Sequence, residues 1–265
     1  MNVWVAGIGI AGPGLDGWAA AREILARRVP YEPVPTVLAA SDWLPAAERR
    51  RTGVPVKLAL AVGREAFAHA QWDAAQAATV FTSSGGDCEN VHQICETLAS
   101  SARDISPTRF HNSVHNAAAG YWGIATGSQR ASTSLCCHDA SFAAGLLEAA
   151  VQCTTADEAV ALIAYDQVYP EPLHSVRPIS AHFGVALLLA PSSVPRACGS
   201  LEIILEPGGS SATTMQDASL EALRVGVPAA RCLPLLAALA QPSAVDITLG
   251  FVAGSRLRVR VDHAG

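Results

Sequence analysis

Residues 134–152 join three kinds of segment in an order that restricts the folds open to this 265-residue chain. The short apolar run 134–136 predicts a strand, and the apolar residues after position 140 recur at helical spacing. The polar residues 137–139 form an elbow between them. The first turn of a helix presents unpaired backbone N–H groups and the positive end of the helix dipole. The unit therefore predicts a place where an oxyanion or a thiolate would be stabilised.

Apolar runs of strand length alternate with helical patterns along most of the chain. Strands are expected at 3–8, 79–82, 159–164, 184–189 and 201–205, helices at 17–27, 56–70, 110–126 and 229–239, and a hairpin at 245–251 with 257–261. Asp16 and Asp87 are expected to cap the helices that follow them. Strands that alternate with helices imply an α/β fold with a mostly parallel sheet.

Charge and cysteine content exclude several functional classes. The formal net charge is -5, and Lys57 is the one lysine of the chain. Nucleic-acid binding depends on clustered basic residues, so no nucleic-acid partner is expected. The seven cysteines show no repeated C-x-x-C spacing, which indicates a reduced, cytoplasmic protein without a disulfide framework. No apolar run reaches about 18 residues, so no membrane span is expected.

Two patterns could suggest a cofactor or a metal ion. Gly7, Gly9 and Gly12 match G-x-G-x-x-G, but a Pro-Gly pair separates the last glycine from the next helix, unlike the dinucleotide-binding fingerprint. His111 and His115 are four residues apart and could face one metal ion. No carboxylate or cysteine lies at useful spacing beside them. Neither a cofactor nor a metal site is therefore expected.

The elbow also resembles a known family. β-Ketoacyl synthases of the thiolase superfamily have a strand of the form S-I-A-x-A that leads to the catalytic cysteine, followed by a helix of small residues. When residues 134–138 are set on that strand, Asp139 takes the position of the cysteine. The other family landmarks match without a gap at Ile105-Ser106-Pro107, Asn116, Ala119-Gly120, Gly127, Ala149-Ala150 and Asp157. The resemblance implies a thiolase-like layered fold. It makes 1–190 the complete N-terminal half and 191–265 a shortened C-terminal remnant packed on the same domain.

The resemblance also shows what catalytic machinery this chain lacks. An active synthase needs a cysteine and two histidines, which its second half supplies in His-Gly-Thr and Gly-His contexts. After Ala190 this chain has one histidine, His263, and neither context occurs. Asp139 cannot replace a thiolate, because a carboxylate that attacks a thioester gives an anhydride and needs strong activation. Asp139 is therefore expected to be a structural cap of the next helix, and Cys137 is the alternative nucleophile.

Within the family, the chain is similar to chain length factors, the subunits that pair with an active ketosynthase in aryl polyene or polyketide biosynthesis. This similarity implies an active synthase subunit and an acyl carrier protein as partners, and no catalysis by the chain alone. Carried over by position, the tunnel or gate residues are Arg109, Phe110, Ser113 and Val114, and the interface residues are Asn116, Gly120, Thr133, Ser134, Leu135 and Cys136. Arg109 stands where the family has an apolar residue, so it either turns away or closes the tunnel. Two alternatives stay open: a stand-alone acyltransferase that uses Cys137, and a purely structural partner that keeps a synthase soluble.

Overall fold

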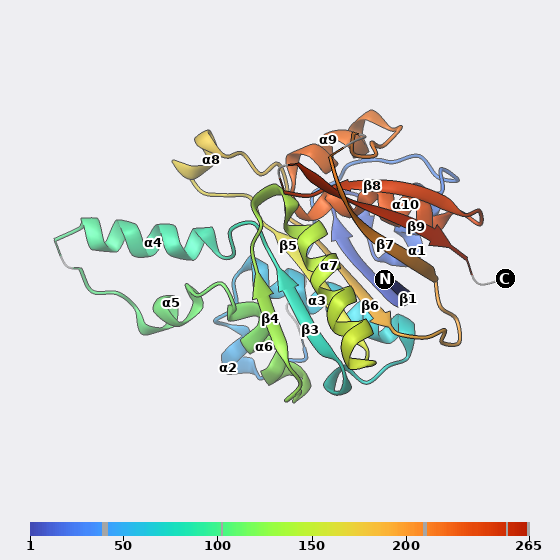
Figure 1. Ribbon diagram of the computed structural model, residues 1–265. Helices are drawn as coiled ribbons and strands as arrows, with labels where there is room; N and C mark the ends of the chain where they lie inside the picture. The colour runs from blue at the N-terminus through green and yellow to red at the C-terminus, as the bar shows by residue number, and fades with distance from the viewer. Residues whose placement is uncertain (39–41, 102, 209–210, 253, 264–265) are drawn as a thin grey trace.

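A computed structural model of the chain describes residues 1–38, 42–101, 103–208, 211–252 and 254–263. One sheet runs through this part of the chain in the strand order β4-β3-β5-β6-β1-β7-β9-β8, with β2 beside β1 (Figure 1). The strands are β1 Asn2–Gly12, β2 Leu15–Asp16, β3 Ala78–Thr82, β4 Ser132–Leu135, β5 Val160–Asp166, β6 Phe183–Ala190, β7 Gly199–Pro207, β8 Val245–Gly250 and β9 Ser255–Asp262. The helices are α1 Trp18–Leu25, α2 Ala46–Arg49, α3 Val54–Ala70, α4 Cys88–Ala99, α5 Pro107–Asn112, α6 Ala117–Thr126, α7 Ser141–Ala156, α8 Leu173–Val176, α9 Ala218–Gly226 and α10 Leu233–Ala240, with 3-10 turns η1 Ala74–Gln76, η2 His138–Ala140 and η3 Ala229–Cys232.

The α/β fold class is confirmed, and the sheet is mixed. Parallel pairing joins β3 to β4 and to β5, the strands whose ends carry the elbow region. β5 and β6 pair antiparallel, because the segment between them returns the chain without a crossover helix packed on the sheet. The pairs β1–β6, β1–β7, β7–β9 and β8–β9 are also antiparallel. The parallel strands are thus β4, β3 and β5, at the end of the sheet that carries the elbow, and antiparallel pairs extend the sheet beyond them.

Helices cover both faces of the sheet, so its central strands are buried on both sides. All seven residues of β5 are buried. Val160 and Leu162 face the core beneath α7 and α10, whereas Ala161 and Ile163 face the core beneath α3 and α6. This alternation is the two-residue period of a strand. It explains why β5 appears in the sequence as an unbroken apolar run.

The glycines of the N-terminal G-x-G pattern serve packing between β1 and α3. A Cβ atom on Gly7 would lie 2.1 Å from the carbonyl oxygen of Ala66, and one on Gly9 would lie 2.0 Å from that of Val62. No side chain fits at such distances, so only glycine lets the strand and the helix approach this closely. The pattern therefore has a packing role in the fold.

The expectation that Asp16 caps α1 is wrong. Gly17 precedes the helix, no side chain caps it there, and Asp16 belongs to β2. The Glu65 carboxylate of α3 instead accepts hydrogen bonds from the backbone N–H groups of Trp18 and Ile10. Burial raises the pKa of Glu65, and these two donors partly oppose that rise. In contrast, Asp87 caps α4 as expected, since its side chain accepts from the N–H of Asn90.

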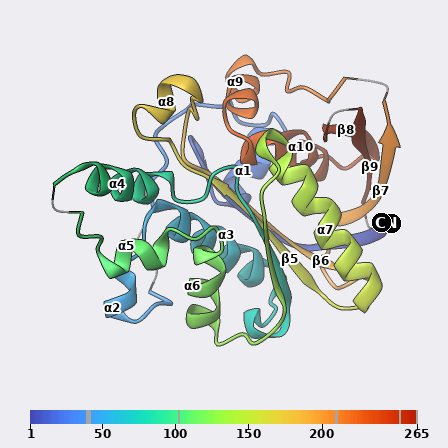
Figure 2. The ribbon, with the colours of Figure 1, turned by 60° about the vertical axis from the view of Figure 1, so that its left-hand side comes forward.

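The single helix expected at 110–126 is also wrong, because the chain breaks there into α5 and α6. The buried side chain of Asn112 ends α5 with contacts to distant residues. Its amide donates to the carbonyl oxygen of Arg51 at 2.8 Å and its side-chain oxygen accepts from Tyr121 at 3.1 Å. α4 and α5 together project from the body of the protein in both views (Figures 1 and 2). We call residues 88–114 the arm.

Candidate functional site

Three loops meet at the carboxyl ends of the parallel strands β4, β3 and β5. Residues 83–86 follow β3, residues 136–139 follow β4, and Asp166 ends β5. Parallel strands present these ends at one edge of a sheet, where ligands bind in many α/β proteins. The hydroxyl of Thr82 donates to the carbonyl oxygen of Ser141 at 2.9 Å, and the thiol of Cys136 donates to that of Ser84 at 3.3 Å. The predicted elbow is therefore part of a larger connected site.

Asp166 is the buried centre of this site. One of its oxygens accepts from the Ser84 N–H at 2.8 Å, from the Ser84 hydroxyl at 2.7 Å and from the Ser83 hydroxyl at 3.3 Å. Its other oxygen accepts from the N–H of Ala229 at 2.8 Å. Burial raises the pKa of Asp166, and the four donors oppose part of that rise. The residue thus ties β3 and β5 to the C-terminal segment that contains η3.

Asp139 lies at the elbow, where the resemblance places a nucleophile, but its side chain does not cap α7. The helix begins at Ser141 without a side-chain cap. The two oxygens of Asp139 instead accept from Arg177 at 2.9 Å and from Arg231 at 3.0 Å. The capping role expected for Asp139 is therefore wrong. Two guanidinium groups from distant parts of the chain outcompete the helix N-terminus, because charge-assisted hydrogen bonds are stronger than neutral ones.

The space beside Asp139 is almost filled. The cavity there has a volume of about 10 Å³, and Arg231, Arg224 and Thr248 line it together with Asp139. A cavity of that size holds about one water molecule. His263, the one histidine after β6, lines a different cleft. Within the described residues, the C-terminal segment thus supplies the elbow with an arginine and no imidazole.

The cysteines near the elbow differ in their surroundings. Burial raises the pKa of the Cys88 thiol to about 11, so this group stays protonated at neutral pH. The N–H of Cys137 donates to the hydroxyl of Ser141 at 3.0 Å, and the Cys137 thiol has no hydrogen bond within the described part of the chain. A nucleophilic thiol needs a neighbouring base or cation that stabilises its thiolate. The hydrogen bonds around Cys137 provide no such group.

The four gate residues lie at the base of the arm. The Phe110 side chain is 66% exposed and that of Val114 is 49% exposed, which is high for apolar residues. Ser113 donates its hydroxyl hydrogen bond to the carbonyl of Phe110 at 2.8 Å. Arg109 borders a cleft of about 300 Å³ that also contains Asp87. Burial raises the pKa of Asp87, and the charge of Arg109 opposes part of that rise. An exposed apolar surface of this kind is typical of a place where another protein binds.

The residues predicted for the interface lie on β4 and α6. β4 is the last strand at one end of the sheet and pairs only with β3. Asn116 and Gly120 are exposed, and a Cβ atom on Gly120 would meet nothing within 4 Å. Thr133 and Leu135 are half-buried and face α7, where Thr133 accepts a hydrogen bond from Gln152 at 2.9 Å. The structure thus brings these residues together along one open edge.

The sequence reasoning missed three residues of this site, Asp166, Arg177 and Arg231. A carboxylate at the end of the buried strand 160–166 was a signal for Asp166, because a charge is rarely buried without partners. The two arginines carried no signal, since they lie 38 and 92 residues after Asp139 in segments of no clear pattern.

The histidine pair forms no metal centre in the structure. The His111 ring packs edge-to-face against the Tyr121 ring, with 6.3 Å between the ring centroids. The Nε2 atom of His115 lies 3.1 Å from the carbonyl oxygen of Ser83. Within the described residues, no three histidine, cysteine or acidic side chains gather as metal ligands. In the same part of the chain, no helix is both long enough and apolar enough to cross a membrane.

Comparisons with known proteins agree with this geometry. The family model for the N-terminal domain of beta-ketoacyl synthases matches residues 18–235. A solved structure titled as the ketosynthase ApeO in complex with its chain length factor ApeC, from Xenorhabdus doucetiae, has a TM-score of 0.74 at 21% identity. That match covers 98% of this chain and 99% of the other. The ishigamide ketosynthase/chain length factor has a TM-score of 0.73 at 14% identity, and the match covers 100% of this chain and 99% of that one.

A third solved structure describes AntDE:AntF, a type II PKS acyl-carrier protein in complex with its ketosynthase bound to the hexaketide. It has a TM-score of 0.78 at 10% identity, and the match covers 99% of both chains. At these identities the likeness shows a shared fold. A comparison with curated protein sequences finds no match. Because the family model covers well over half of its residues, the chain belongs to the beta-ketoacyl synthase family and carries that family's N-terminal domain.

Proposed function

We propose that this chain is a chain length factor: a cytoplasmic subunit that does not catalyse condensation itself. It pairs with an active β-ketoacyl synthase and forms part of the acyl tunnel during polyketide chain elongation of the aryl polyene type. The observation that carries the proposal is the state of the elbow. Asp139 occupies the nucleophile position and is held by Arg177 and Arg231, beside a cavity of about 10 Å³. Such a site has neither a thiolate nor room for an acyl chain.

Two exposed features support a role as a partner subunit. The arm carries apolar side chains in water, among them Phe110, Val114 and Leu98. The backbone of β4 is open on the side away from β3. Exposed apolar patches and free strand edges are the surfaces through which proteins associate. Two of the solved structures named above contain a ketosynthase with a chain length factor, and the third contains an acyl-carrier protein with its ketosynthase. We infer that an acyl carrier protein delivers the growing chain to the synthase partner.

The elbow should remain inactive even when the family's cysteine is restored. We expect the Asp139→Cys variant alone to condense acyl and malonyl thioesters at less than about 10⁻³ of the rate of an active synthase. General acid–base groups and oxyanion donors each contribute about 10²- to 10⁴-fold, and this site has no histidine pair. Mass spectrometry of the thioester products measures the rate. Turnover by the unmodified chain, with acylation of Cys137 on mass labelling, would instead identify a stand-alone acyltransferase.

Side-chain volume at Phe110 should set product length in the reconstituted pair. We expect Phe110→Ala to lengthen the product and Phe110→Trp to shorten it, because overpacking a pocket costs about 1–3 kcal/mol per misfit. That range changes the ratio of neighbouring chain lengths by about 5- to 150-fold. Val225→Ala, at an exposed apolar residue of α9, is the matched control. Unchanged lengths in both Phe110 variants, with the synthase insoluble when this chain is left out, would favour a purely structural partner.

A further inference from the structure

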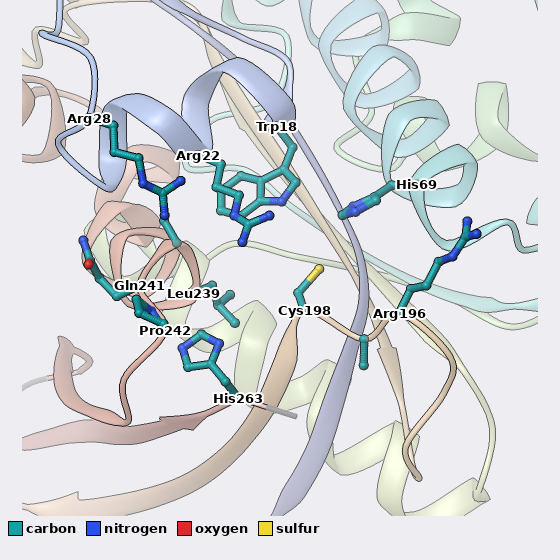
Figure 3. Close-up of a pocket in the computed structure, with 12 residues that line it drawn as sticks. Trp18, Arg22, Arg28, His69, Arg196, Cys198, Leu239, Gln241, Pro242 and His263 are labelled. Atoms are coloured by element: carbon teal, nitrogen blue, oxygen red, sulfur yellow. The ribbon is translucent and has the colours of Figure 1, made fainter. Parts of the chain in front are cut away.

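A second cleft, of about 360 Å³, opens at the place where β1 separates from β7. β7 pairs with β1 only from Asn2 to Val5, and β1 then continues beside β6 without β7. Side chains from α1, α3, the segment before β7, the end of α10 and the C-terminal segment surround this space (Figure 3). The cleft shares no lining residue with the cavity beside Asp139. Its volume is that of a pocket for a small ligand.

The charged side chains described in the lining of this cleft are all basic. Arg22, Arg28 and Arg196 line it, and none of its described lining residues is acidic. Arg28 pairs with Glu23 at 2.7 Å. Within the described residues, Arg22 and Arg196 form no ion pair. Figure 3 shows the Arg22 side chain inside the cleft and the Arg196 side chain directed away from Arg22, so Arg22 is the unpaired guanidinium group placed to bind an anion there.

Two imidazoles, those of His69 and His263, add polar nitrogen atoms to the cleft. His69 accepts the N–H of Ile8 at its Nδ1 atom, at 3.2 Å, and burial lowers the pKa of His69. Its neutral ring therefore carries its hydrogen on Nε2, as a donor. The Nε2 atom of His263 is buried and has no hydrogen-bond partner among residues 1–263 as far as the structure describes them. Buried polar atoms without partners are rare in native proteins and call for a specific explanation, such as a missing ligand.

Part of the cleft lining is apolar. Trp18, Leu239 and Pro242 give the cleft an apolar surface (Figure 3). We propose that this cleft binds a small organic phosphate monoester, with its phosphate group at Arg22 and its organic part against Trp18 and Leu239. A phosphate monoester carries a charge of about -1.5 to -2 at neutral pH, so it is attracted more strongly than a singly charged carboxylate to the unpaired Arg22 and the neighbouring Arg28. Arginine is also the side chain best suited to bind phosphate oxygens in a bidentate manner.

Isothermal titration calorimetry of the full chain with phenyl phosphate tests the proposal. We expect one saturable site with a Kd of about 1 mM or tighter, weakened at least about tenfold in Arg22→Gln and less in Arg22→Lys, which keeps the charge but loses the bidentate geometry. Inorganic phosphate should bind less tightly than phenyl phosphate, because it leaves the apolar wall empty. Benzoate should bind at least about tenfold less tightly, because it carries a single charge.

Arg50→Gln is the matched control, since Arg50 is an exposed arginine that does not line the cleft. It should bind phenyl phosphate as the unmodified chain does. Absence of saturable binding by the unmodified chain, equal weakening in Arg50→Gln, or equal affinity for benzoate would overturn the proposal. The site is independent of the proposed chain length factor role, so that either can fail while the other stands.

Discussion

Replacement of Asp166 by alanine is expected to lower the free energy of unfolding by about 2–5 kcal/mol. The substitution leaves the N–H groups of Ser84 and Ala229 buried without an acceptor, and each such group costs about 1–3 kcal/mol. The two serine hydroxyls can turn to other partners and contribute less. Urea unfolding of the full chain measures the change. Because η3 is attached through Ala229, the loss should also loosen the segment that carries Arg231.

Asp166→Asn and a surface control separate this effect from a general loss of charge. An asparagine keeps one acceptor for Ser84 but turns its NH₂ group toward the N–H of Ala229, so a loss of about 1–3 kcal/mol is expected. Glu158→Ala removes an exposed ion pair with Arg130 at 3.2 Å and should cost less than about 1 kcal/mol. If Asp166→Ala were no more harmful than Glu158→Ala, the central role given to Asp166 would be wrong.

The pKa of Asp166 also fixes the sign of a pH effect. Its pKa in the folded protein is raised above its value in the unfolded chain. The folded state therefore binds more protons between these two values, and the contribution of Asp166 to stability falls as the pH rises through the folded-state pKa. The Asp166→Asn variant should lack this part of the pH dependence.

Strands and helices with a clear apolar period could be predicted from the sequence. The buried strand at 159–164 and the helix at 56–70 correspond to β5 and α3 with small shifts of their ends. The hairpin of β8 and β9 was predicted as well, because both of its strands alternate. These elements could be predicted because their apolar periodicity depends only on residues close together in the sequence.

The failures share one physical cause, since a polar side chain found a distant partner in each case. Asp16 was expected to accept hydrogen bonds from the first backbone N–H groups of α1. The N–H of Trp18 donates instead to Glu65 of α3, 47 residues later in the chain. Asn112 ends α5 because it bonds to Arg51 and Tyr121. Asp139 leaves the start of α7 for Arg177 and Arg231. The sequence pattern located the elbow between β4 and α7, but only the fold could show which charges reach it.

The second prediction with a large expected effect concerns the outer edge of β4 and the association of this chain with a synthase. The carbonyl groups of Ala131 and Leu135 accept from the N–H groups of Thr79 and Ser83 on β3. Backbone groups alternate in direction along a strand, so the N–H of Ser134 points away from β3, toward the open edge. A partner strand that adds to this edge would need that N–H group, as in other cases of strand addition.

Ser134→Pro is therefore expected to weaken the complex with the active synthase by at least about tenfold and to leave the fold of this chain intact. Proline removes the outward donor and is tolerated on an edge strand, whereas Thr133→Pro would remove a donor to β3 and should disturb the sheet itself. Size-exclusion chromatography of the co-expressed pair measures association, and circular dichroism of the isolated chain measures the fold. Unchanged association of a folded Ser134→Pro variant would show that the partner does not extend this sheet. The arm, with Phe110 and Leu98, would then be the surface to test, because it offers the other exposed apolar contact at this end of the molecule.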